Sequence, residues 1–379
     1  MKHPEDIFNP RHYERVRLPQ LEAETLPPWC YTSQAFYERE VERIFMRHWV
    51  FIGRSDCIPD PGDYFTLDPV DVPLIVVRDD DGEVRAFANT CRHRGTRLAD
   101  GQGNCRAFTC PYHGWAYALD GRLISNAGME QTAKLDNGAY GLFPIRLEIW
   151  DGFLFVNFAE IGSGLAEQSV DLPSIVASHS LSDWVCTRRR EYDLACNWKL
   201  CLENQRESYH VATVHRGTLS DQFPAQLPAM GQWSGSHFAH EGTIAAKLGS
   251  EKTLPQVPSL EGPASEGTYF IAIYPASFLV FTVDCMWWME FQPLGPRRTK
   301  VVVGSCFPQS TVQRPDFEEV VEAYYARLDA SHPEDNDAAI LQQRGLDSPH
   351  AQPGRLSVRE AGVHVVDNWI LDQVLDTVD

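Results

Sequence analysis

Two short loops that each supply one cysteine and one histidine restrict the fold of this chain more than any other feature. Cys91 and His93 form a Cys-x-His loop, and after sixteen further residues Cys110 and His113 form a Cys-x-x-His loop. Such a set can bind a zinc ion, or a [2Fe-2S] cluster in which histidines replace cysteines on one iron. The spacing and the surroundings of the loops decide between these two sites.

The grouping of the ligands favours the two-iron cluster. A Cys2His2 zinc finger groups Cys with Cys and His with His, whereas here each loop can give a thiolate to one iron and an imidazole to the other. Gly95 and Gly114 allow tight turns near the inorganic sulfides, and Trp115 and Tyr117 follow the second loop. The segment resembles the Rieske motif. Zinc is the alternative, and Cys105, which lies off the pattern, is expected to be structural.

Length and charge restrict the class of protein. A chain of 379 residues is expected to form two domains. Its 52 acidic and 33 basic residues give a net charge of −19, so nucleic acid is not expected as a partner. The amino terminus has no apolar segment of the signal-peptide kind, and the longest apolar stretch, Tyr269–Val283, is too short to cross a membrane. We therefore expect a cytoplasmic protein that does not bind membranes.

The order of strand-like and helix-like segments in the sequence predicts an α+β protein. Short β-rich runs separated by Gly, Asp and Asn are typical of a small all-β domain, and the strand-like and helix-like blocks that follow indicate a second, mixed domain. The expected limits are 1–47 for an amino-terminal segment packed on the second domain, 48–162 for the β domain and 163–379 for the second domain.

Several elements can be predicted within these limits. Helical spacing of apolar residues predicts a helix over 33–49, capped by Ser33 or Thr32. Acidic helices are expected near 316–330 and 335–343, and the apolar stretch 269–283 predicts two strands and a turn.

A second group of candidate metal ligands lies in the segment NWKLCLENQRESYHVATVH. Glu203, Glu207 and His210 would share one face of a helix, and His215 would point away from it. If both histidines bind one metal, the helix must bend or end between them. Two histidines and one carboxylate suit non-haem Fe(II) oxygen chemistry. Taken alone, the pair is also compatible with one core and one surface histidine.

Together the two segments resemble the Rieske non-haem iron oxygenase α subunits, and the resemblance runs from about Trp49 to Trp369. The family pattern E-N-x-x-(D/E)-x-Y-H-x4-H supplies both iron histidines, which here are His210 and His215. Its bridging carboxylate, which links the iron site to a cluster histidine of the neighbouring subunit, matches Glu207. Most similar motifs have Asp there, and the longer Glu resembles the branch that acts on carnitine.

The third iron ligand is implied by a segment far downstream. The stretch PEDNDAAILQQRGL resembles the family's E-D-x7-Q-R-G-L segment, which assigns the ligand to Asp335. Asp337 is the alternative, because it could substitute if the helix started differently. Both acids could also belong to a solvated helix start, where the helix dipole favours carboxylates.

The resemblance also implies a fold, cofactors and partners. The fold is a small Rieske [2Fe-2S] domain followed by a helix-grip (START-like) catalytic domain with an antiparallel sheet. An NAD(P)H-dependent flavin or iron-sulfur reductase supplies electrons, and the subunits form a ring, most often a homotrimer, in which Glu207 couples His113 of one subunit to His210 of the next. Asn204 orients water or substrate. The implied ligands are Cys91, His93, Cys110 and His113 for the cluster, and His210, His215 and Asp335 for a mononuclear Fe(II).

The carboxy-terminal pattern QQRGLDSP...GRLSVREAGVHVVDNWI looks more like the choline, glycine betaine and carnitine monooxygenase branch than like the naphthalene or biphenyl dioxygenases. We therefore expect O2-dependent hydroxylation or oxidative cleavage of a small quaternary ammonium or betaine-type substrate. Ring hydroxylation or dioxygenation of an aromatic acid is the alternative. Aromatic cages hold quaternary ammonium groups. Candidate cage side chains, which could equally be core residues, are Trp233, Tyr274, Phe278, Trp287 and Trp288.

Two functions of other classes also fit parts of the sequence. A Rieske protein that transfers electrons without catalysis would need only the first site, and the three candidate iron ligands argue against it. A zinc-stabilised binding module is the other alternative.

Overall fold

The computed structural model describes residues 4–169, 172–219, 229–233, 236–241, 249 and 252–375. Backbone contacts divide the chain into two compact units. One unit is Phe51–Gly162, and the other combines the segments on either side of it, Met1–Val50 and Ser163–Asp379. The domain limits expected from the sequence stay predictions.

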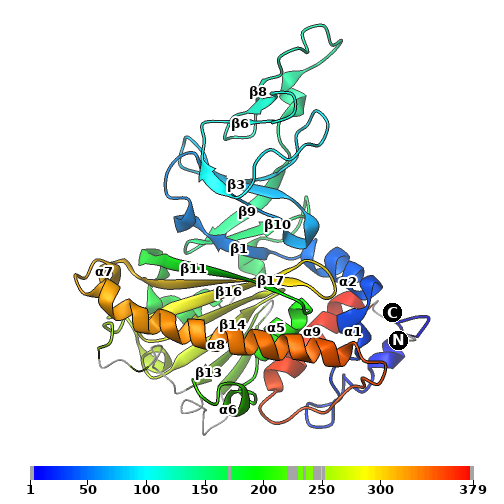
Figure 1. Cartoon of the computed structure of the whole chain (residues 1–379), viewed down its shortest axis with the longest axis vertical. Coiled ribbons are helices and arrows are strands. Elements are labelled where there is room, and N and C mark those ends of the chain that lie inside the picture. The colour runs from blue at the N-terminus through cyan, green and yellow to red at the C-terminus, as the bar shows by residue number, and fades with distance from the viewer. Residues whose placement is uncertain are drawn as a thin grey trace. The chain divides into compact units, whose positions relative to one another are not determined.

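The unit Phe51–Gly162 is built mainly from β-strands (Figure 1). A seven-stranded sheet has the order β1-β10-β9-β4-β3-β2-β5, and a three-stranded sheet has the order β6-β7-β8. Its strands are β1 (Val50–Arg54), β2 (Asp63–Leu67), β3 (Leu74–Arg78), β4 (Val84–Ala88), β5 (Gln102–Asn104), β6 (Phe108–Thr109), β7 (Ala116–Tyr117), β8 (Leu123–Ser125), β9 (Pro144–Trp150) and β10 (Phe153–Asn157). Short 3₁₀-helices are Ser55–Cys57, Pro69–Asp71 and Asn137–Tyr140.

The core of this unit surrounds the two predicted metal loops. Cys91 and Cys110 are each only 2% exposed, and they belong to one buried cluster with Trp115 and Tyr117. The other members are Ile75, Val77, Phe87, Leu98, Phe108, Leu119, Leu123 and Leu142. The apolar core therefore fixes both loops through their cysteines.

The other unit contains a seven-stranded sheet with the order β11-β17-β16-β15-β14-β13-β12, in which each pair is antiparallel. The strands are β11 (Trp184–Leu194), β12 (Ala229–Trp233), β13 (Ser236–Glu241), β14 (Thr268–Ile273), β15 (Ser277–Phe281), β16 (Met286–Pro293) and β17 (Thr299–Pro308). β14 and β15 are the two strands predicted over 269–283, and that prediction is confirmed.

Helices in this unit cover the sheet and its end (Figure 1). The longest, α8, packs on β17 through ring contacts of Phe307 with Phe317 and Tyr324. The α-helices are α1 (Trp29–Thr32), α2 (Gln34–Glu40), α3 (Leu165–Gln168), α4 (Leu172–Val176), α5 (Trp198–Asn204), α6 (Val211–Val214), α7 (Gln309–Val312), α8 (Phe317–Leu346) and α9 (Ala361–Val374). A π-helical turn, Val41–Phe45, continues α2, and 3₁₀-helices are Pro10–Tyr13, Ala177–His179, Leu181–Asp183 and Gly262–Ser265.

The two acidic helices expected near 316–330 and 335–343 form one continuous helix, so the predicted break is wrong. α8 runs through Pro333, although proline removes one backbone hydrogen bond from a helix interior. Buried side chains lie on both sides of the proline, among them Leu328 and Ala339. Their burial offsets the lost bond, and a sequence pattern cannot reveal that packing.

Other predicted features agree with the structure. The helix expected over 33–49 is present as α2 and the π-helical turn, and Ser33 caps it by accepting a hydrogen bond from the Phe36 amide (3.4 Å). The mixture of antiparallel sheets and helices confirms the α+β class. Within the described ranges, no helix is both long and apolar enough to cross a membrane.

Candidate metal centres

The two cysteine-histidine loops share one backbone design. In each loop the cysteine amide donates to the carbonyl of the fifth residue after it, and a glycine amide donates back to the cysteine carbonyl. Both glycines have positive φ, 77° and 74°, a conformation that favours glycine. The bonds are Cys91 to Thr96 (2.8 Å) and Gly95 to Cys91 (2.9 Å), then Cys110 to Trp115 (2.7 Å) and Gly114 to Cys110 (3.0 Å).

The four predicted ligands sort into an inner and an outer pair. The thiols of Cys91 and Cys110 are buried and in contact. The two histidines lie nearer the surface than the thiols. His93 is half-buried and His113 is exposed, and the centroids of their rings lie 4.7 Å apart. Two thiolates for one iron and two imidazoles for the other are the donors of a Rieske cluster.

Two local features fit a bound metal group at these loops. The ring of His93 stacks on Trp115 at 5.0 Å, and its buried Nδ1 has no hydrogen-bond partner in the described chain. A buried polar atom without a partner is costly unless it binds a ligand or water. Burial alone would raise the pKa of the Cys110 thiol, but the backbone N–H groups of Tyr112 and His113 lower that pKa below its ordinary value. The loop therefore favours the thiolate that binds iron.

Cys105 does not join the loops. It is partly buried and packs against the core from between them, and burial raises the pKa of its thiol. This position agrees with the structural role expected for it.

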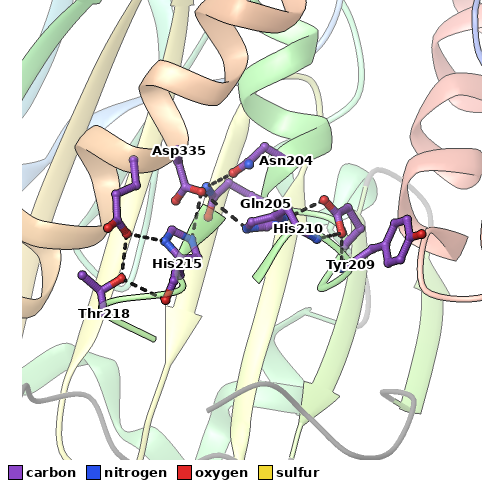
Figure 2. A network of polar contacts seen from close by, with 9 residues as sticks. Asn204, Gln205, Tyr209, His210, His215, Thr218 and Asp335 are labelled. Carbon is purple, nitrogen blue, oxygen red and sulfur yellow. Dashed lines mark hydrogen bonds and ion pairs between the residues drawn. The ribbon is translucent and has the colours of Figure 1, made fainter. Parts of the chain in front are cut away.

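In the other unit, three side chains from two segments far apart in the sequence meet at one point (Figure 2). Ligand atoms of His210, His215 and Asp335 all lie within 4.8 Å of one another. Asp335 Oδ1 lies 3.0 Å from His215 Nε2 and 3.4 Å from His210 Nε2. Neither contact has hydrogen-bond geometry, so the buried Oδ1 lacks a hydrogen-bond partner among the described residues. Three donor atoms that converge on one point in this way fit a 2-His-1-carboxylate metal site.

The end of α5 lets both histidines reach this point. Asn197 caps the helix start by accepting from the Lys199 amide (3.0 Å), and the helix ends at Asn204. His210 and His215 then flank the single turn α6 as its cap residues. The expected bend or end between the histidines is replaced by an earlier helix end: α5 stops before both residues, and the single turn α6 lies between them.

The expected common helical face of Glu203, Glu207 and His210 is wrong for the same reason. Glu203 is the last but one residue of α5, and its carboxylate accepts from the Tyr31 hydroxyl (2.9 Å) in the interior. Glu207 lies beyond the helix and faces His210 instead. Of these two glutamates, therefore, only Glu207 contacts the triad.

A carboxylate holds the Nδ1 atom of each histidine. Glu207 Oε1 lies 2.6 Å from His210 Nδ1, and Glu334 Oε2 lies 2.7 Å from His215 Nδ1. Ionised carboxylates only accept, so each Nδ1 carries the hydrogen and each Nε2 is left as a metal donor. Sequence reasoning missed Glu334, although it stands directly before Asp335 in the E-D motif.

The charges of the site suit a bound cation. Burial alone would lower the pKa of His215, but Asp335 and Glu334 raise that pKa above its ordinary value. Burial alone would raise the pKa of Asp335, but the neighbouring imidazoles lower it. The site thus stabilises positive charge near an ionised Asp335.

The structure distinguishes the two candidate acids on α8. Asp335 faces the histidines, and Asp337 is exposed and is not among the converging atoms. Asn204 lines a small cavity with Asp335, and it also lines a cavity of about 190 Å³ with Glu207 and His210. Asn204 is therefore close enough to the triad for the role expected of it.

The register of the sheet shows which candidate cage residues lie on the same face of the sheet as the cavity beside Asp335. Met289 lines the cavity beside Asp335, so alternation along β16 puts Trp287 on the same face and Trp288 on the opposite one. Phe278 pairs with Met289 and shares its face. Tyr274 stacks on Trp369 at 4.3 Å as a core residue. The side chain of Trp233 lies outside the described residues.

The two rings on the metal-facing side already contact cations of the chain. The Arg327 guanidinium lies 5.4 Å from the ring centre of Trp287, and that of Arg206 lies 5.6 Å from the ring centre of Phe278. The cage expected from the sequence thus stays a prediction.

Two family models match the chain, one over each group of candidate ligands. The family described as "Rieske [2Fe-2S] domain" matches residues 48–136, and that described as "Ring hydroxylating alpha subunit (catalytic domain)" matches residues 181–376.

Relatives that are similar over nearly the whole chain belong to the same kind of protein. The chain is 30% identical to the glycine betaine monooxygenase oxygenase subunit of Chromohalobacter salexigens, covering 94% of this chain and 87% of that protein. It is also 30% identical to the chloroplastic choline monooxygenase of Spinacia oleracea, covering 97% and 82%. A solved structure of the quaternary ammonium Rieske monooxygenase CntA with L-carnitine is 22% identical, with a TM-score of 0.80 over 98% of this chain and 99% of that one, and so shares the fold.

Proposed function

Because the chain belongs to the Rieske non-haem iron oxygenases, the family of ring-hydroxylating α subunits, we propose that it is the oxygenase component of a monooxygenase for a quaternary ammonium compound. The similarity to relatives named for glycine betaine and choline, over 94% and 97% of this chain, carries the substrate class. The triad in the second unit supports catalysis over simple electron transfer, because electron transfer would need only the cluster loops.

Membership of the family sets the cofactors, a Rieske [2Fe-2S] cluster and a mononuclear iron. The cluster supplies electrons one at a time, and the iron supplies open coordination positions for O2 chemistry. We assign the cluster to a domain of residues 48–162 and the iron to a domain of residues 163–379, with residues 1–47 packed on the latter. The assigned ligands are Cys91, His93, Cys110 and His113 for the cluster, and His210, His215 and Asp335 for the iron.

The residues around the triad hold its donors in place. Glu207 accepts the Nδ1–H of His210, and we assign it the bridging position between His210 and His113 of a neighbouring subunit. Asn204 lines the cavities beside the triad, where its amide orients water or substrate.

The proposed reaction uses one O2, two electrons and two protons for each substrate molecule. One oxygen atom enters a C–H bond beside the ammonium nitrogen, and the other leaves as water. The new hydroxyl group sits on a carbon that also bears nitrogen, so the C–N bond breaks to give an aldehyde, a tertiary amine and the proton of that hydroxyl group. Aldehyde release is therefore the signature of this substrate class.

Subunits of this family act with a reductase and O2 and form oligomers. For this chain we propose an NAD(P)H-dependent flavin or iron-sulfur reductase and a homotrimer, in which the cluster of one subunit serves the iron of the next. The cytoplasmic location stays a prediction.

A single turnover of chemically reduced, iron-loaded protein tests the proposal. The protein meets O2 and a panel of choline, betaines, carnitine and aromatic acids, with products followed by mass spectrometry and released aldehyde by a trapping assay. We expect aldehyde from a methylammonium compound, at up to about one per active site, and none from His215→Ala, which keeps the cluster absorbance. A hydroxylated ring product with no aldehyde would overturn the substrate class.

A further inference from the structure

The two histidines of the triad differ in the carboxylates that hold them. Glu207, which follows α5 by three residues, holds His210, and our proposal gives it the bridging position between subunits. His215, the more buried ligand at 3% exposure, is held instead by Glu334 from α8. Glu334 lies outside the ligand set of His210, His215 and Asp335, so its contact with His215 needs a separate explanation.

Glu334 makes two short hydrogen bonds through one oxygen. Its Oε2 accepts the Nδ1–H of His215 at 2.7 Å and the hydroxyl of Thr218 at 2.7 Å. Thr218 follows His215 by three residues, and its amide donates to the His215 carbonyl (3.0 Å). The imidazole, the carboxylate and the hydroxyl thus form a closed local network around the metal ligand (Figure 2).

The position of Glu334 on α8 couples two ligands. It directly precedes Asp335, whose Oδ1 lies 3.0 Å from His215 Nε2. One helical turn therefore presents a carboxylate to each nitrogen of the same imidazole. A shift of α8 would move both contacts together.

An acidic residue that served only as a solvated charge on the helix surface would be exposed and would not contact His215. Asp337, on the same turn, is exposed and has no place in the network, whereas the Glu334 side chain is only 30% exposed and points at His215. The contrast separates a specific contact from ordinary surface charge.

We propose that Glu334 is a positioning residue for the mononuclear iron, acting through His215. It fixes the Nδ1–H tautomer and the ring orientation of His215, and its negative charge makes Nε2 a stronger donor. This role goes beyond the ligand set and rests on the assignment of His210, His215 and Asp335 to the iron. Loss of such a partner typically weakens metal binding about 10- to 100-fold.

Metal affinity of the full-length, cluster-containing protein tests this role directly. Dissociation constants for Fe(II) at the emptied mononuclear site are measured by chelator competition for wild type, Glu334→Ala, Glu334→Gln and Asp337→Asn. We expect Glu334→Ala to bind Fe(II) about 10- to 100-fold more weakly. Glu334→Gln should recover part of that loss, because its amide oxygen still accepts from Nδ1, and Asp337→Asn should match wild type.

The visible spectrum of the Co(II)-substituted site gives a readout that does not depend on activity. Glu334→Ala should change the ligand-field bands, since the orientation of His215 is no longer fixed, and Thr218→Val should change them less. The cluster absorbance and circular dichroism serve as the check on folding. Unchanged affinity and unchanged bands in Glu334→Ala would overturn the proposal.

A His215→Ala variant separates failure of this inference from failure of the iron assignment. If His215→Ala binds metal as wild type does, the triad itself is wrongly assigned. If His215→Ala loses the metal and Glu334→Ala does not, the triad stands and Glu334 has no positioning role. The substrate class is not involved in either outcome.

Discussion

Asp335 and Asp337 stand two residues apart on α8, yet only one of them faces the histidines. We expect Asp335→Asn to lose the mononuclear iron and keep the cluster, a fall from about three irons per chain to about two, because a neutral amide is a weaker iron ligand than a carboxylate. Elemental analysis against the cluster absorbance measures this. Asp337→Asn is the matched control and should keep its iron, and the reverse pattern would assign the ligand to Asp337.

Residue patterns could predict the donors themselves but not all of their partners. The four cluster residues and both iron histidines belong to motifs whose residue spacing is typical of metal ligands. Glu203 and Glu334 also stand in those motifs, but one turns into the interior to Tyr31 and the other turns to His215. Spacing does not say which way a carboxylate points, because that depends on segments distant in sequence.

At the scale of elements, α5 and α9 bury two acids against each other. Asp367 of α9 is fully buried and contacts Glu203 of α5, with Lys199 nearby. Burial raises the pKa of Asp367 to about 7, and Lys199 only partly opposes this. A carboxyl group whose pKa is raised on folding stabilises the protein fully at pH values below its unfolded pKa, and this contribution is lost as the pH rises through the folded value.

Asp367→Asn should therefore remove a pH-dependent loss of stability. Between pH 5 and pH 7 the free energy of unfolding of wild type should fall relative to that of Asp367→Asn by on the order of 2 kcal/mol. Urea unfolding at both pH values, followed by circular dichroism, measures the difference. Parallel changes in the two proteins would mean that Asp367 is not buried as a neutral acid.

Element types were more predictable than element limits. Alternation and turn residues indicated β14 and β15, and Ser33 marked the start of α2. The single helix α8 was not predictable, since Pro333 and the polar residues around it look like a helix end. The sequence could not show that Trp287 and Trp288 lie on opposite faces relative to the metal site, because this depends on how β16 pairs with β15 and β17.

At the scale of the whole molecule, each metal centre lies within one compact unit. The cluster loops belong to Phe51–Gly162, and the triad belongs to the unit formed by the rest of the chain. The motifs and the family predicted this division of tasks, because each cofactor requires its own donor set. For the substrate, the sequence indicated a class and no single compound, because the motifs specify metal donors and not the side chains that contact a substrate.

One chain of this family carries both an iron-sulfur cluster and a separate mononuclear iron. Iron and acid-labile sulfide per chain are measured on anaerobically reconstituted protein, together with electron paramagnetic resonance of the reduced cluster, to determine whether this chain holds both. We predict about three irons and about two sulfides, and about two irons with the same sulfide in His215→Ala. Zinc without sulfide, or only two irons in wild type, would mean that this chain does not hold both centres.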